Sequence, residues 1–68
     1  MNKFAERLNR TLRETNVPQR ELARRVNMSQ SIINNYCRGE REPTLDVLML
    51  VCKALGESAD YMLGMTDD

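Results

Sequence analysis

The sequence predicts an all-α fold of five short helices built around one small core. Its 68 residues allow a single domain over residues 1–68, since folded domains usually contain about 100 to 150 residues. Hydrophobic residues make up 41% and charged residues 29%, a balance typical of globular proteins rather than disordered segments. Aromatic residues make up only 4%, which disfavours a sheet protein, and apolar residues recur at helical spacing.

The first helix is expected at residues 3–15. Its apolar positions recur every four residues, with charged residues on the other faces, and they are Phe4, Leu8 and Leu12. Asn2 can cap the N-terminus of this helix. Asn16 can end it, because asparagine tolerates the left-handed conformation in which many helices end.

A second helix is expected at residues 19–26 and a third at residues 30–38, joined by only three residues. Pro18 opens the second helix with its backbone angle already set. In the connection, Asn27 suits a positive φ and Ser29 can cap the third helix. Two short helices joined this tightly must cross at a steep angle. The residues expected to be buried on them are Leu22, Ala23, Val26, Ile33 and Tyr36.

The last two helices are expected at residues 45–55 and 59–63. Thr44 can cap the first of them and Ser58 the second. The helix at 45–55 is expected to bury Leu45, Leu48, Cys52 and Leu55. Residues 65–68 are expected to form a frayed end.

Several classes of function are disfavoured by what the sequence lacks. Without histidine, the commonest general base and the commonest neutral metal ligand are missing. Cys37 and Cys52 form no Cys-x-x-Cys pair and there is no glycine-rich phosphate loop, so we expect no metal, no cofactor and no enzyme. With no signal peptide and no apolar run of membrane length, we expect a cytoplasmic protein without membrane or small-molecule partners.

Residues 19–39 follow the pattern Gln-x-x-Leu-Ala-x-x-apolar-x-apolar-Ser-x-x-x-Ile-x-x-apolar-x-x-Gly. The matching residues are Gln19, Leu22, Ala23, Val26, Met28, Ser29, Ile33, Tyr36 and Gly39. This pattern resembles the helix-turn-helix of the Cro and lambda-repressor-like (Xre-type) family of DNA-binding regulators. The likeness continues through Pro43, Leu45, Leu48, Ala54-Leu55-Gly56 and the closing Asp60-Tyr61-Met62-Leu63-Gly64. It implies a compact five-helix lambda-repressor-like domain that binds double-stranded DNA.

The third predicted helix carries polar, uncharged side chains on its outer faces. With its apolar residues turned inward, helical spacing leaves Gln30, Ser31, Asn34 and Asn35 outside. Glutamine and asparagine can each form a bidentate pair with adenine, and serine bonds either donors or acceptors. The resemblance implies base contacts for Gln30, Ser31 and Asn35. Ile32 and Asn34 are candidates for further base or backbone contacts.

The net charge of zero hides two oppositely charged regions. Residues 1–41 hold nine basic and four acidic residues, a net of +5, and residues 42–68 hold one basic and six acidic, a net of −5. Charges are screened over about 8 Å at physiological salt, so DNA on the basic region would hardly feel the acidic one. We expect phosphate contacts from Arg38 and Arg41, with Arg10 as a weaker candidate. The resemblance implies a further phosphate contact from Gln19.

We expect a repressor that binds a palindromic operator as a homodimer. Half-sites are read about 34 Å apart, whereas a globule of this length has a radius of gyration near 11 Å. The expected dimer interface consists of Tyr61, Met62 and Met65, which are more apolar than a free end requires. The alternative is an antitoxin or another protein–protein interaction module that keeps the same fold.

The remaining polar and thiol side chains have simpler expected roles. Taken singly, five arginines are expected to be solvated charges in weak helix pairs; they are Arg7, Arg10, Arg20, Arg24 and Arg25. Many family members place glutamate where Cys37 stands, as a partner for the arginine matching Arg13. Without it, Arg13 is left with Glu21, solvent or a phosphate. Cys37 is expected near the surface and Cys52 in the core.

Overall fold

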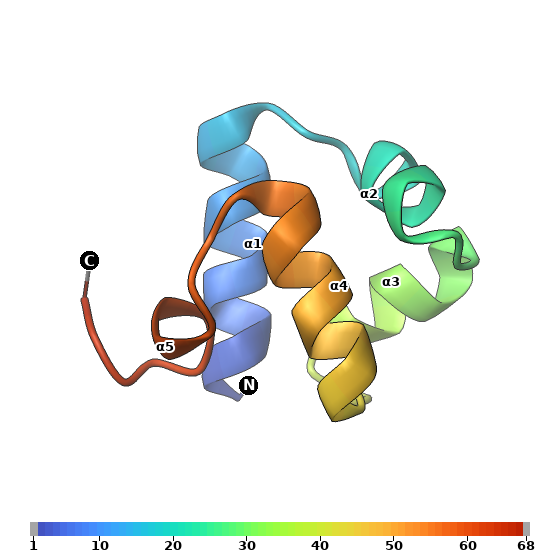
Figure 1. Cartoon of the computed structure of the whole chain (residues 1–68). Coiled ribbons are helices and arrows are strands. Elements are labelled where there is room, and N and C mark those ends of the chain that lie inside the picture. The colour runs from blue at the N-terminus through green and yellow to red at the C-terminus, as the bar shows by residue number, and fades with distance from the viewer. Residues whose placement is uncertain (1, 68) are drawn as a thin grey trace.

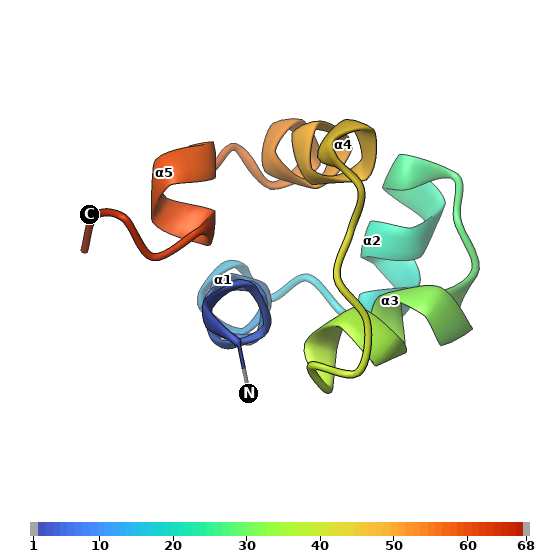
Figure 2. The same cartoon turned by 90° about the horizontal axis from the view of Figure 1, so that it is seen from below.

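The computed structural model describes residues 2–67 and contains five α-helices within that range. They are α1 (Lys3–Thr15), α2 (Gln19–Val26), α3 (Gln30–Cys37), α4 (Leu45–Leu55) and α5 (Ala59–Met62). Two views show α2 and α3 together on one side and α5 on the opposite side, with α1 and α4 between them (Figures 1 and 2). This all-α architecture confirms the predicted fold class.

Four of the helices begin at the side-chain caps that the sequence predicts. The cap oxygen accepts a hydrogen bond from the backbone N–H three residues later at Asn2 (2.7 Å), Ser29 (3.2 Å), Thr44 (3.2 Å) and Ser58 (3.1 Å). The exception is α2, which starts after Pro18 without a side-chain cap. Because each of these bonds joins residues only three positions apart, the sequence alone can locate the helix starts.

Helix ends lie within one residue of their predicted positions. Asn16 and Asn27 have positive φ, 58° and 56°, and they end α1 and α2 as expected. Both α3 and α5 end one residue earlier than predicted, at Cys37 and Met62. In each case a glycine with positive φ stands two residues beyond and reverses the chain.

Every helix contributes one of the largest fully buried side chains to a single core. These residues are Leu8, Leu22, Ile33, Val51 and Met62, in order from α1 to α5. Beside them, the rings of Phe4 and Tyr36 meet edge to face with centroids 6.1 Å apart, which packs the start of α1 against α3. Among the described residues, no helix is long and apolar enough to cross a membrane.

The apolar residues of α4 that are buried differ from those that the sequence predicts. Leu48 and Cys52 are buried as expected, but Leu45 is 80% exposed and Leu55 is only partly buried. Val51, which the sequence analysis left out, is completely buried. Leu45 is the first residue of α4, and it lines an open groove instead of entering the core.

The predicted dimer interface is wrong for two of its three residues. Tyr61 and Met62 are 5% and 0% exposed, so they belong to the core and have no surface to offer a partner. The reason is that the four-residue α5 packs its apolar residues against α1 and α4, and Arg7 covers the ring of Tyr61. Met65 is exposed, and it alone of the three is available to a partner.

Candidate DNA-binding site

The connection between α2 and α3 forms a tight helix-turn-helix. Asn27 adopts the left-handed conformation at the end of α2, and the backbone N–H of Met28 donates to the carbonyl of Ala23 at 2.9 Å. Ala23 is buried between the helices, and its small side chain lets them approach. Asparagine forms this turn because it is among the few residues that tolerate positive φ.

The outer face of α3 offers polar side chains that none of the described residues occupies. Gln30 and Ser31 are exposed, while Ile32, Asn34 and Asn35 are half-buried. Within residues 2–67 none of the side-chain amides or hydroxyls on this face takes part in a hydrogen bond. Their donors and acceptors are therefore free to meet base edges. Ile32 packs partly against the core, so only part of its side chain is accessible.

Gln19, the expected phosphate contact at the start of α2, lines a groove between α1 and α2. The groove is formed by Asn9, Leu12, Arg13, Asn16, Val17, Pro18 and Gln19. Arg13 therefore shares one surface hollow with Gln19. It is exposed and forms no ion pair with any described residue. The sequence left Glu21, solvent or a phosphate as partners of Arg13. Glu21 is excluded, because its carboxylate pairs with Arg24 and Arg25.

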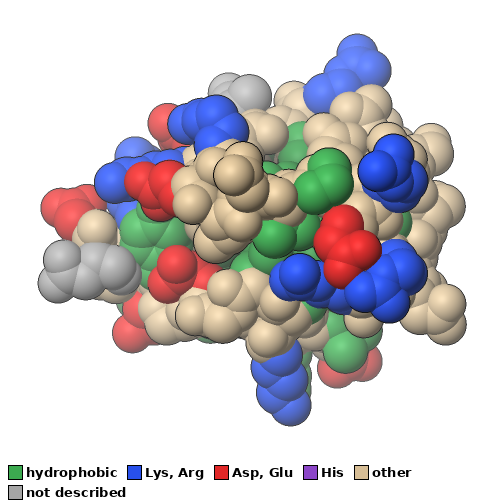
Figure 3. Space-filling view, turned by 90° about the horizontal axis from the view of Figure 1, so that it is seen from above, with side chains coloured by type: hydrophobic (Ala, Val, Ile, Leu, Met, Phe, Trp, Pro, Cys, Tyr) green, Lys and Arg blue, Asp and Glu red, His purple; other side chains and the backbone are tan. Residues whose placement is uncertain are grey.

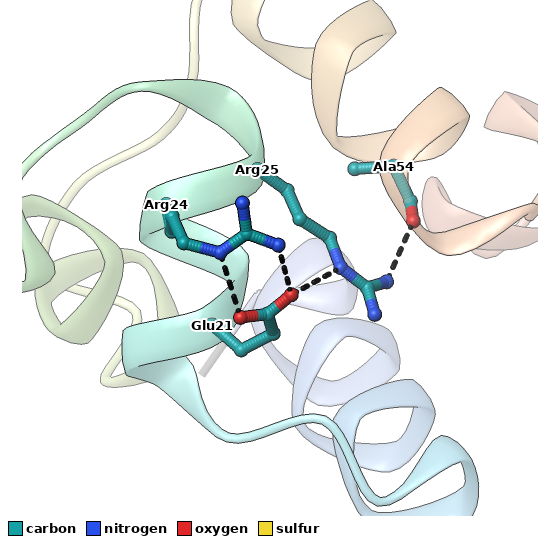
Figure 4. A network of polar contacts seen from close by, with 4 residues as sticks. All are labelled: Glu21, Arg24, Arg25 and Ala54. Carbon is teal, nitrogen blue, oxygen red and sulfur yellow. Dashed lines mark hydrogen bonds and ion pairs between the residues drawn. The ribbon is translucent and has the colours of Figure 1, made fainter.

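Two arginines of α2 belong to the protein scaffold, as Figure 4 shows. Arg24 donates to both carboxylate oxygens of Glu21, at 2.9 and 2.6 Å. Arg25 donates to the same carboxylate at 3.0 Å and to the carbonyl of Ala54 near the end of α4, also at 3.0 Å. Hydrogen bonds from Arg24 and then Arg25 lower the pKa of Glu21 to about 2. These helix pairs match the role expected of both arginines.

The arginines expected to contact phosphates, near α3 and on α1, differ in whether they already form ion pairs within the protein. Arg41 is exposed and forms no ion pair within residues 2–67, whereas Arg38 pairs with Glu40 at 2.9 Å. Arg10 pairs with Glu14 at 3.3 Å, and its guanidinium lies 6.0 Å from the centre of the Tyr61 ring. The structure thus places Arg10 on the side of α1 next to α5, apart from α3.

Arg7 and Cys37 are both buried, contrary to the sequence prediction. Arg7 is 9% exposed, with its guanidinium 4.5 Å from the Tyr61 ring centre and hydrogen bonds to the Thr66 carbonyl (3.0 Å) and to Asp67 (3.3 Å). Residues 66 and 67 of the expected frayed end are thereby tied to α1, and residue 68 lies outside the described residues. Cys37 is 4% exposed, and burial raises the pKa of its thiol. It is covered because the last turn of α3 rests on α1.

Charged side chains are more mixed on the surface than the two halves of the sequence suggest. Figure 3 shows basic and acidic side chains intermingled on the upper face, with hydrophobic side chains between them. Part of this mixing is local, since Glu21 is enclosed by its two arginine partners. The +5 counted along residues 1–41 already includes Glu21, so this pairing lowers the positive charge available at Arg24 and Arg25 without changing the sum.

Asn9 is a residue of this region that the sequence analysis missed. It lines the groove with Gln19 and Arg13, and its side chain reaches the end of α3. The available signal was its place in the middle of a helix, where asparagine is a weak helix former and its amide competes for backbone groups.

Comparison with known proteins gives matches over most of the chain. A family model described as "Helix-turn-helix" matches residues 6–62. The chain is 28% identical over 65 residues to the uncharacterized HTH-type transcriptional regulator YobD of Bacillus subtilis (strain 168), covering 96% of this chain and 58% of YobD. It is 30% identical over 61 residues to the HTH-type transcriptional regulator ImmR of the same organism, covering 90% of this chain and 48% of ImmR. The chain thus spans about half the length of these relatives. No solved structure matches it significantly.

Proposed function

The chain belongs to the Cro and lambda-repressor-like (Xre-type) helix-turn-helix family, and from this we propose that it regulates transcription by sequence-specific DNA binding through α3. The observation that carries the proposal is the outer face of α3, where Gln30, Ser31 and Asn35 present hydrogen-bonding groups that no described residue occupies. Uncharged amides and hydroxyls distinguish base edges, whereas charged side chains would mainly hold phosphates.

The size of α3 supports entry into the major groove. Its eight residues span about 12 Å at 1.5 Å each, close to the groove width of about 12 Å. Gln19 and Arg13 line the groove between α1 and α2, and Arg41 lies in the loop that follows α3. We assign phosphate contacts to Gln19, Arg41 and Arg38, with Arg38 first leaving Glu40. Arg10 is no longer favoured, because it lies beside α5.

We further propose a homodimer that represses by covering a palindromic operator. The described residues extend over 28 × 22 × 21 Å, less than the roughly 34 Å between half-sites, so one copy is too small to read both. With Tyr61 and Met62 buried, the contact between copies moves to the exposed apolar residues of the α4–α5 surface, defined as Leu45, Met49 and Leu63, together with Met65. Leu45 and Leu63 line one groove with Phe4, Pro43 and Leu48.

Selection of bound sequences from a random pool of double-stranded DNA tests the proposal directly. We expect a palindromic consensus with half-sites about one helical turn apart, and light scattering should find two copies on each selected site. One copy per palindrome would refute the dimer but not base reading. No enrichment of any sequence, with a partner protein co-purifying instead, would favour the interaction-module alternative.

A further inference from the structure

The two ends of α3 are held by different neighbours. At its N-terminus, Ser29 caps the helix and the turn from α2 is closed by the bond between Met28 and Ala23. At its C-terminus, the neighbour is α1. Within residues 2–67, the hydrogen bond from Asn9 to the carbonyl of Cys37 is the only one that joins α1 to α3.

Asn9 uses its side-chain amide to tie two helices together. Its Nδ2 donates to the carbonyl of Ala5 at 2.9 Å, one turn earlier in α1, and to the carbonyl of Cys37 at 2.8 Å. Both amide hydrogens are thus used within the protein. The bond to Ala5 orients the amide along α1, so the second hydrogen is aimed at the end of α3.

The Cys37 carbonyl is the last backbone acceptor of α3, and it is the one that the Asn9 side chain bonds. The three carbonyls before it are satisfied by the chain leaving the helix: Asn34 accepts from Arg38 (2.9 Å), Asn35 from Glu40 (3.0 Å) and Tyr36 from Gly39 (3.1 Å). The Cys37 carbonyl, next to a thiol that is 4% exposed, accepts from Asn9 instead. Leaving a buried acceptor unpaired is costly. The bond from Asn9 therefore favours a single position of the last turn of α3 against α1.

We propose that Asn9 is a positioning residue that sets where the C-terminal half of α3 sits against DNA. It acts through the Cys37 carbonyl, two residues after Asn35, without touching DNA itself. Gln30 and Ser31 lie at the other end, where Ser29 and α2 determine the position. Loss of Asn9 therefore disturbs base reading by Asn35 and spares base reading by Gln30. This inference rests on the proposed reading of bases by α3.

A base-by-base binding profile on the selected operator tests this inference. Single variants Gln30→Ala and Asn35→Ala first identify which base pairs each side chain reads. Asn9→Ala and the isosteric Asn9→Asp, which replaces the donor with a carboxylate facing the Cys37 carbonyl, are then profiled. In the Asn9 variants, we expect the preference for the correct base at the base pairs that Asn35 reads to fall on the order of tenfold. The preference at the base pairs that Gln30 reads should be retained.

Asn2→Ala is the matched control, because it removes a side-chain hydrogen bond of the same helix that stays within the first turn of α1. It should lower stability while leaving the base profile unchanged. An unchanged profile in the Asn9 variants, or an equal loss at all base pairs, would overturn the inference. A wild-type protein with no base preference would instead overturn the proposed function.

A measurement on the wild-type protein covers the case in which the Asn9 variants do not fold. Nuclear magnetic resonance should detect a scalar coupling across the hydrogen bond between Asn9 Nδ2 and the Cys37 carbonyl carbon, and slow exchange of the Asn9 amide hydrogens. Fast exchange without coupling would mean that the bond does not hold α3, and the inference would fail.

Discussion

Helices α3 and α4 begin in the same way but present opposite chemistry to solvent. Each is capped by a hydroxyl side chain, from Ser29 and Thr44, and each buries one fully inaccessible residue in the shared core. Outside, α3 carries Gln30 and Ser31 beside half-buried asparagines, whereas α4 carries Leu45, Met49 and Leu50. The same kind of cap and the same apolar spacing form both helices, whereas their solvent-exposed side chains determine what each helix can bind. The contrast supports DNA for α3 and a second copy for α4.

The largest effects are expected where the two helices are alike, on their inner faces. Ile33→Ala should lower the free energy of unfolding by about 2 to 5 kcal/mol, because it opens a cavity in the core. Val51→Ala in α4 should cost less, since fewer methyl groups are removed. Urea denaturation measures both. An unchanged midpoint for either variant would show that the two helices do not share one core.

The outer face of α3 should control which sequence is bound. Gln30→Ala should weaken operator binding by about 1 to 3 kcal/mol per half-site and relax preference at one base pair, with little change on random DNA. Arg41→Ala is the contrast, because it should weaken all sequences alike and reduce the salt slope by about 1. Titrations at several salt concentrations measure both. Equal losses on operator and random DNA for Gln30→Ala would refute base reading.

The outer face of α4 should control assembly rather than sequence preference. Met49→Glu places a charge on the α4–α5 surface; we expect about tenfold weaker binding to the palindrome, roughly 1.4 kcal/mol, and unchanged binding to a single half-site. Stability should change by less than about 0.5 kcal/mol, because Met49 is 55% exposed.

Leu50→Glu is its control, since Leu50 is also exposed but lies about 100° further around α4. It should leave both binding constants unchanged. If both variants weakened the palindrome equally, the contact between copies would not lie on the α4–α5 surface.

The smallest effect concerns the network that joins α2 to the end of α4. The folded-state pKa of Glu21 is about 2, below its ordinary value of 4.5, so the stabilising effect of its charge is present above pH 4.5. That contribution is lost as the pH falls from 4.5 towards 2. It should be small, because the arginine pairs are exposed to solvent. Thermal unfolding of wild type and Glu21→Gln over this range measures it, and a parallel pH dependence in both would contradict the assignment.

The sequence by itself determined the helices and the turn that joins α2 to α3. Caps at Asn2, Ser29, Thr44 and Ser58 and left-handed asparagines at helix ends are local features, satisfied within three or four residues of the same segment. The same local spacing predicted the outward position of Gln30 and Ser31.

The tertiary structure decided which amphipathic residues are covered and by what. Arg7 is buried because Tyr61 and residues 66–67 lie over it, and Leu45 is exposed because no described residue covers its side chain. Asn9 and Cys37 are 28 positions apart and meet only when α3 packs on α1. The physical reason is common to all of them. Helical spacing tells which way a side chain points, but its exposure and its hydrogen-bond partner depend on the element that lies opposite.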